Sequence, residues 1–205
     1  MTKSEFIDRY IYTFEPDFAN SNRDRILLEE TLYQLFEILN DGIQYDVIST
    51  KERKSDYYQY LSERGPVARQ QIVFRCAYIL EKIYFYHPPL LQDPKLNFVE
   101  LCLIVKNKSA MRHFSKILAT ALQNRQFPLT SEQREQLIIA LAGWASDPQI
   151  RVAVKVWVFE CFIEFQKESE TAREVIRDLW ELFSINPTPG MVVRLKQWYK
   201  KMAAL

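Results

Sequence analysis

Apolar residues recur along this chain every three to four positions, which is the spacing of the buried face of an amphipathic helix. Breaker residues separate the apolar stretches. The pattern predicts helices over residues 4–14, 24–39, 43–63, 65–87, 93–105, 108–123, 130–144, 147–167, 170–183 and 190–202. The helix over 43–63 is the weakest of these, because the charged run TKERKSD favours a break inside it. The sequence therefore predicts an all-α protein.

Turn and cap residues set the expected helix ends. The NDG triplet at 40–42 is a stop signal, and the GP pair at 65–66 is a start signal. Asp93 fits a helix N-cap, with Pro94 at the first helical position, where its missing N–H costs nothing. The turn at 145–146 is short, so the helices on either side of it are expected to form an antiparallel pair.

Arginines recur at nearly regular intervals. Arg69, Arg112, Arg151 and Arg194 are separated by 43, 39 and 43 residues, and Arg25 stands 44 residues before Arg69. A fixed period of this size is typical of helical repeat proteins. We therefore expect an α-α superhelix of about five antiparallel helix pairs, forming a single domain over residues 1–205.

The stretch DPQIRVAVKVWVFECF, which begins at Asp147, resembles the second helix of a HEAT repeat. In that family an Asp in the turn and an Arg on the first helical turn form a ladder between neighbouring repeats. The resemblance implies a right-handed armadillo-type superhelix and a structural role for Asp147 with Arg151. It extends the same structural interpretation to the other repeat positions, Arg69, Arg112 and Arg194.

The order FRCAYILEKIY, LTSEQREQLIIALAGWASDPQIRVAVKVWVF and RLKQWYKK resembles a group of short bacterial helical-repeat proteins without an assigned activity. Some of that group carry an adenylosuccinate lyase label. The lyase family is about twice as long and resembles a fumarase-type bundle with a Ser-Ser-x-Met-Pro loop, which this chain lacks. With His87 and His113 as the only histidines, we reject the lyase interpretation.

Composition excludes several kinds of chemistry. The sequence has four glycines and no GxxxxGK[ST], GxGxxG or GxSxG motif, so phosphate-binding loops and nucleophile elbows are not expected. Cys76, Cys102 and Cys161 lie in apolar stretches, which predicts buried, reduced thiols. We expect no catalytic residue, no cofactor and no metal site, and hence no enzyme.

Two features bear on location. No run of eighteen apolar residues is long enough to span a bilayer, and the opening MTKSEFIDRY has no apolar segment of the signal-peptide kind. We expect a cytoplasmic protein without membrane contact.

Charge is uneven along a chain whose formal net charge is only +1. Residues 1–40 contain four basic and eight acidic side chains, whereas residues 188–205 contain four basic side chains and no acid. A polar terminal cap explains this asymmetry, and so does docking of an acidic partner or head-to-tail self-association of the chain.

We therefore expect a non-enzymatic interaction scaffold for a protein partner, with a groove formed by the second helices of the pairs. The expected partner-binding residues are Arg75, His113, Lys116, Lys155, Lys196 and Lys200.

The alternative is a nucleic-acid-binding protein that resembles HEAT-like DNA alkylation-repair glycosylases, which use Trp and Asp near the lesion. The tryptophans available are Trp144, Trp157, Trp180 and Trp198. A duplex binder needs about six to ten phosphate contacts on one face. A net charge near zero makes this alternative the weaker one.

The helical phase itself can be tested at Val154. Val154→Asp places a carboxylate at a position expected in the core, so the free energy of unfolding should fall by several kcal/mol. Chemical denaturation measures this change. A tolerated Asp at 154 would mean that the helical phase is wrong.

Overall fold

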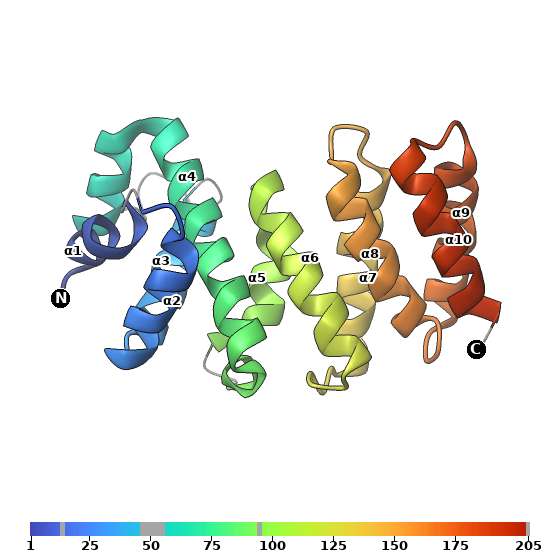
Figure 1. Cartoon of the computed structure of the whole chain (residues 1–205), viewed down its shortest axis with the longest axis horizontal. Coiled ribbons are helices and arrows are strands. Elements are labelled where there is room, and N and C mark those ends of the chain that lie inside the picture. The colour runs from blue at the N-terminus through green and yellow to red at the C-terminus, as the bar shows by residue number, and fades with distance from the viewer. Residues whose placement is uncertain (13–14, 46–55, 94–95, 204–205) are drawn as a thin grey trace. The chain divides into compact units, whose positions relative to one another are not determined.

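The computed structural model describes residues 1–12, 15–45, 56–93 and 96–203 (Figure 1). These residues form helices and no strand, which confirms the predicted all-α class. The α-helices are α1 (Lys3–Phe6), α2 (Phe18–Leu28), α3 (Leu32–Gln44), α4 (Asp56–Tyr86), α5 (Phe98–Ile104), α6 (Lys108–Gln123), α7 (Ser131–Ser146), α8 (Val152–Phe165), α9 (Glu170–Ser184) and α10 (Pro189–Ala203). A π-helix, η1 (Ile7–Ile11), follows α1, and a 3-10 helix, η2 (Pro88–Gln92), follows α4.

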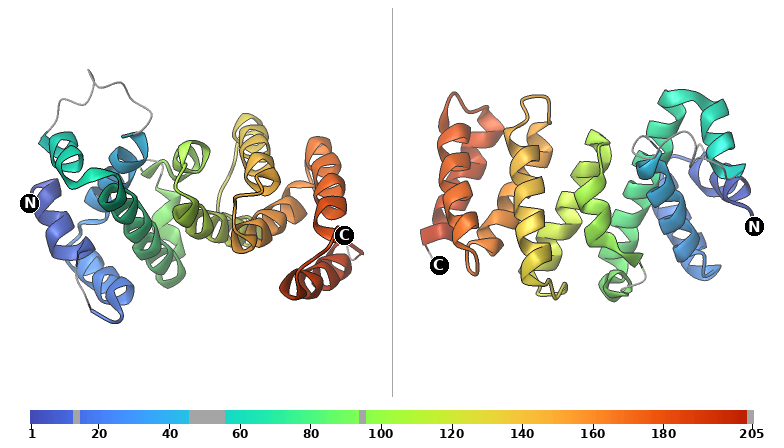
Figure 2. Two further views of the ribbon diagram at one scale, coloured as in Figure 1. Left: turned by 90° about the horizontal axis from the view of Figure 1, so that it is seen from above. Right: turned by 180° about the vertical axis from the view of Figure 1, so that it is seen from behind.

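The chain divides into two compact units. Unit 1 is Met1–Phe114 and unit 2 is Ser115–Leu205, so the division falls inside α6. In unit 2, α7, α8, α9 and α10 lie side by side in every view (Figures 1 and 2). The single domain over 1–205 and the superhelix of five pairs stay predictions.

Unit 1 is built around α4, which packs against α1, η1, α2, α3 and η2. Gly65 interrupts this helix with backbone angles of φ 74° and ψ 171°, a conformation that glycine adopts at no steric cost. Pro66 follows and opens the second part of the helix, as the GP signal predicted. The helix ends at Tyr86, before two prolines.

One predicted helix, over 24–39, is wrong, because the chain forms α2 and α3 there. Glu30 adopts a left-handed conformation with φ 53°, and the N–H of Thr31 donates to the carbonyl of Ile26 at 3.0 Å. The N–H of Glu30 donates to the carbonyl of Leu27, which completes a Schellman-type helix end. This helix end carries no stop signal in the sequence, because glutamate, and not glycine, occupies the left-handed position.

The predicted stop at 40–42 is also wrong, because α3 continues to Gln44. A Cβ atom on Gly42 would lie 2.8 Å from Cγ2 of Val73 on α4. The glycine therefore allows α3 and α4 to approach closely and does not end the helix.

Two more helices begin later than expected. The helix predicted from Asp93 begins at Phe98, after Asn97 with φ 51°, and Pro94 lies outside the described residues. The helix predicted from Asp147 begins at Val152. Asp147 instead closes a turn, since its Oδ1 accepts from the N–H of Gln149 at 2.7 Å.

The remaining predictions agree with the structure more closely. The predicted range 108–123 coincides with α6, and α7, α9 and α10 match their predictions within two residues. The prediction over 4–14 corresponds to α1 and η1, and its residues 13–14 lie outside the described residues. Much of the prediction over 43–63 also falls outside them, at 46–55.

Unit 2 is built around α8, which packs against α7, α9 and α10. Nine of the twelve side chains from Val154 to Phe165 are buried, including the carboxylate of Glu160. Oε1 of Glu160 accepts from Nε1 of Trp198 at 2.9 Å, and Oε2 accepts from Nζ of Lys201 at 2.5 Å. The Trp198 ring stacks on Phe159 at 4.1 Å. This carboxylate therefore fastens α10 to α8.

The cysteines are free and buried, as predicted. Burial raises the pKa of Cys76 and Cys102 far above the usual range of a thiol, so neither is poised as a nucleophile. In the part of the chain that the structure describes, no helix is long and apolar enough to cross a membrane.

The close approach at Gly42 predicts a specific mutational effect. In Gly42→Ala the new methyl group meets the stiff side chain of Val73, so the free energy of unfolding should fall by about 1–2 kcal/mol despite the better helix propensity of alanine. Urea denaturation measures it. The matched control is Gly143→Ala in α7, where nothing lies within 4 Å of the new Cβ and a stabilisation of about 0.5–1 kcal/mol is expected. Stabilisation by both substitutions would contradict the packing role of Gly42.

The Glu160 hydrogen bonds predict a second effect. Glu160→Ala leaves the indole N–H of Trp198 buried without an acceptor and opens a void, so a loss of about 3 kcal/mol is expected. Glu164→Ala is the control, because the Glu164 ion pair with Lys167 lies near the surface and is worth at most about 1 kcal/mol. Equal losses in thermal denaturation would show that the carboxylate of Glu160 does not hold α10.

Candidate interaction groove on α4 and α6

A hollow of about 610 Å³ lies in unit 1 between the second part of α4 and the start of α6. We call it the α4–α6 groove. It is lined by Pro66, Val67, Gln70, Gln71 and Phe74 on α4, and by Lys106, Asn107, Lys108 and Ser109 at the entry to α6. The helices predicted over 65–87 and 108–123 contain most of these lining residues, and the arrangement of helix pairs stays a prediction.

One side chain fixes the two walls of this groove. Oδ1 of Asn107 caps α6 by accepting from the N–H groups of Ser109 at 3.0 Å and Ala110 at 2.8 Å. Nδ2 of Asn107 donates to the carbonyl of Gln70 at 3.0 Å and to its side-chain oxygen at 2.5 Å. Asn107 therefore ties the start of α6 to α4, and the groove is preformed.

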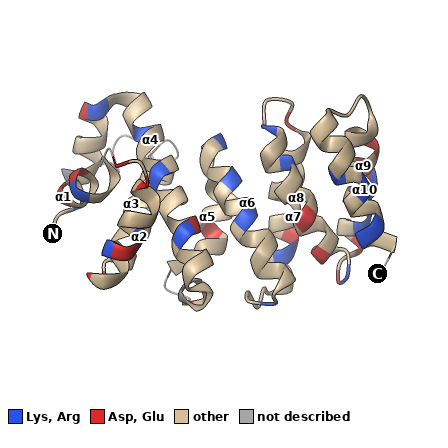
Figure 3. Cartoon of the chain, viewed as in Figure 1, with Lys and Arg blue, Asp and Glu red and all other residues tan. Residues whose placement is uncertain are grey.

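The groove combines exposed apolar surface with positive charge. Val67 is 73% exposed, and Phe74 is half-buried beside it. The lining residues include Lys106 and Lys108 and no aspartate or glutamate. Lys106 forms no ion pair with any described residue. Lys and Arg also lie on successive turns of α6 (Figure 3).

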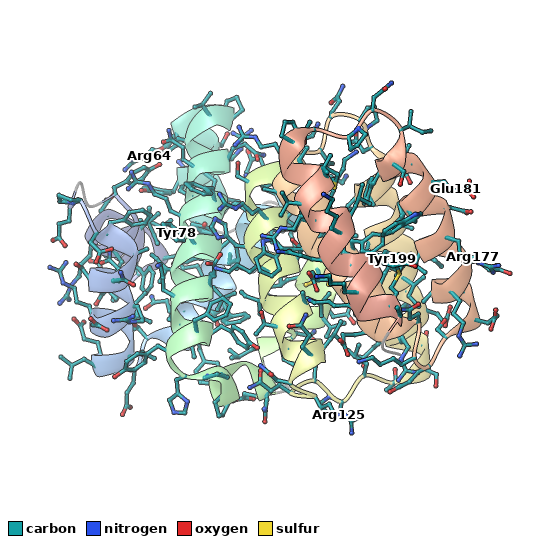
Figure 4. The ribbon with its side chains drawn as sticks, turned by 45° about the vertical axis from the view of Figure 1, so that its right-hand side comes forward. Arg64, Tyr78, Arg125, Arg177, Glu181 and Tyr199 are labelled. Atoms are coloured by element: carbon teal, nitrogen blue, oxygen red, sulfur yellow. The ribbon has the colours of Figure 1, made fainter. Side chains whose placement is uncertain are left out.

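An aromatic cluster continues from the groove along α4. The ring of Phe74 lies 5.5 Å from His113, and the ring of Tyr78 stacks on His113 at 5.0 Å. Tyr78 lies midway along the second part of α4 (Figure 4), and Nζ of Lys82 is 5.4 Å from the centre of its ring. The groove therefore leads into half-buried aromatic rings with a cation beside them.

His113 was predicted to face a partner, but only 5% of it is exposed. Its Nδ1 nitrogen donates to the buried carboxylate of Glu81 at 2.5 Å. Helical phase alone placed His113 on the second-helix face, and α4 covers most of that position. The ring packs against Phe74, which lines the groove, and any direct contact of His113 with a partner stays a prediction.

Arg75, the other predicted residue of unit 1, is engaged within the unit. Its Nη1 donates to the carbonyl of Ile11 at 2.5 Å, and its guanidinium carbon lies 4.9 Å from the centre of the Phe18 ring. These contacts hold η1 and α2 against α4. The sequence could not reveal them, because Ile11 and Phe18 are distant in the chain.

The other four predicted residues lie in unit 2. Lys116 is half-buried, with its Nζ 5.9 Å from the ring of Trp157. Burial lowers the pKa of Lys155, against the opposing effect of Asp147. Lys196 and Lys200 are exposed on α10. Lys116 and Lys155 are thus partly withdrawn from solvent, whereas Lys196 and Lys200 are free to meet a partner.

The repeat arginines have different surroundings. Among the described residues, Asp147 and Arg151 form no ion pair, and Arg151 lies exposed just before α8. Arg69 donates to the carbonyl of Leu61 and lies over the ring of Tyr45 at 4.3 Å. Arg112 is exposed on α6, and Arg194 is half-buried and donates to the side chain of Gln197. A common ladder role for these residues stays a prediction.

Within the described ranges, no three His, Cys, Asp or Glu side chains lie close enough together to hold a metal ion.

The four tryptophans differ in burial. Trp144 and Trp198 are buried, and Trp157 and Trp180 are half-buried. Two of the four tryptophans are therefore core residues and unavailable as a stacking platform.

Four residues of the groove, Val67, Phe74, Lys106 and Asn107, were not predicted from the sequence. The run KNKS at 106–109 carries a readable signal, because asparagine directly before a helix is a preferred N-cap. The exposure of Val67 had no comparable signal in the sequence.

Comparison with known proteins gives no match. No protein-family model, curated protein or solved structure matches this chain, so the likeness to HEAT repeats rests on the residues quoted above.

Proposed function

We propose that this protein is a non-enzymatic interaction scaffold and that the α4–α6 groove binds an acidic segment of a protein partner. The observation that carries the proposal is the lining of the groove, which pairs exposed Val67 with Lys106 and Lys108 and contains no carboxylate. The segment would place an apolar side chain against Val67 and Phe74 and its acids against the lysines. The superhelical HEAT-like arrangement and the cytoplasmic location belong to the same proposal.

The chemistry of the lining favours binding over catalysis. It presents amides, lysines, one hydroxyl and apolar carbon, and no imidazole, thiol or carboxylate that could serve as a general base. Exposed apolar surface rimmed by polar groups is typical of a protein interaction site. A segment laid between two helices matches the helix-in-groove mode of peptide recognition.

The nucleic-acid alternative has less support at this groove. Two lysines line it, which is fewer than the six to ten phosphate contacts that a duplex binder uses. A nuclease treatment separates the two possibilities in the experiment below.

Selection from a displayed peptide library tests the groove directly. We expect the full chain to enrich acidic peptides that carry a large apolar residue, with affinity that falls as salt rises. The double variant Lys106→Glu and Lys108→Glu should bind the enriched peptides at least about tenfold more weakly, because like charges then face each other. Fluorescence anisotropy with a labelled peptide measures this.

The control is Arg173→Glu with Arg177→Glu, which makes the same change in net charge on exposed positions of α9. If both double variants lost binding equally, the effect would be one of net charge and the groove would not be the site. Affinity capture from a cell lysate, with and without nuclease, then names the partner. Recovery that depends on nucleic acid would replace the peptide proposal with the nucleic-acid alternative.

A further inference from the structure

The outer face of α10 is only partly polar. Val192 is 37% exposed, Val193 is 56% exposed and Tyr199 is 65% exposed. Lys196 and Lys200 are exposed on the same helix. The spacing of these five residues places them within one face of a helix that turns every 3.6 residues. We call this set the α10 face, and Tyr199 is labelled on it in Figure 4.

The cations of α10 divide into two groups. Lys201 turns inward and donates to Glu160. Lys196 and Lys200 form no ion pair with any residue that the structure describes. Because α10 contains no acidic residue, their charges are not balanced on the helix itself. The α10 face therefore joins apolar surface to two uncompensated positive charges.

Unit 1 contains a hollow of the opposite kind. It measures about 720 Å³ and is lined by Ile26, Leu27, Glu30, Leu32, Tyr33, Pro89, Asp93 and Leu96. Two carboxylates and no lysine or arginine stand among these lining residues. Glu30 forms no ion pair with a described residue, and the hydroxyl of Tyr33 donates to Asp93.

Most of the residues that line this hollow are apolar, namely Ile26, Leu27, Leu32, Pro89 and Leu96. Leu28, the last residue of α2, follows the lining residue Leu27 and is 85% exposed. The volume of the hollow lies within the range of about 300–1,000 Å³ that is usual for binding pockets. Its acids and apolar walls match the lysines and apolar residues of the α10 face.

We propose that the α10 face of one copy of this chain docks into the acidic hollow of a second copy. Tyr199 enters the hollow, and Lys196 and Lys200 lie against Glu30 and Asp93. Burial of the apolar side chains supplies most of the affinity, and the charges select the orientation. This contact goes beyond the proposed partner groove, which lies on other residues.

The contact joins two different surfaces, so it is heterologous. Each copy offers one α10 face and one hollow, which allows copies to add head to tail into a chain or a ring. A symmetric contact between two α10 faces is disfavoured, because it would bring four lysines together without an acid.

Sedimentation velocity of the full chain tests this proposal over a wide range of protein concentration. Wild-type protein should form oligomers as concentration rises, and high salt should weaken them. The tail variant, Lys196→Glu with Lys200→Glu, and the head variant, Glu30→Lys, should each associate at least about tenfold more weakly. Mixing the two variants should restore a dimer, because each retains the surface that the other lacks.

Several outcomes would overturn the proposal. A wild-type protein that stays monomeric at every concentration excludes the contact, and so do oligomers that neither variant weakens. If the head variant still assembled alone, Glu30 would not belong to the surface that α10 contacts, and the proposed hollow would be the wrong site. Far-ultraviolet circular dichroism shows whether the variants fold, and all three substituted side chains are exposed. The variant Lys106→Glu with Lys108→Glu should assemble like wild type, so failure of the partner groove and failure of self-association are separate results.

Discussion

A helix that buries most of its side chains must be covered by neighbours on most of its sides, and in unit 2 that helix is α8. Nine of the twelve side chains from Val154 to Phe165 are buried, so α7, α9 and α10 have to pack around it. Burying the carboxylate of Glu160 in this helix without hydrogen-bond partners would cost free energy. Trp198 and Lys201 on α10 donate hydrogen bonds to it, and these bonds fix the position of α10 against α8.

In unit 1 the central helix is α4, which is longer than α8 and packs against more neighbouring elements. The break at Gly65 lets the two parts of α4 take different directions, and the absent side chain of Gly42 lets α3 come close. Val67 lies exposed two residues after this break, at the start of the second part. Asn107 joins the second part of α4 to the start of α6 and so holds the two walls of the groove together.

Local signals predicted the parts of this fold that local forces decide. The range of α6 and the cap of α7 at Thr130 follow from apolar spacing and capping chemistry. The errors arose where contacts between distant residues decide the outcome. Gly42 looks like a stop until Val73 is placed against it. His113 and Arg75 were likewise predicted to lie on a binding surface. Helical phase gives no information on their hydrogen-bond partners, which lie on other elements.

The buried thiols give each unit its own reporter of opening. Cys76 and Cys102 lie in unit 1, and Cys161 lies on α8 in unit 2. An alkylating reagent in water can reach such a sulfur only when the surrounding helices separate for a moment, so the rate of labelling measures local unfolding. Because the cysteines fall on both sides of the division, mass spectrometry of the labelled peptides would show whether the two units open together or one at a time.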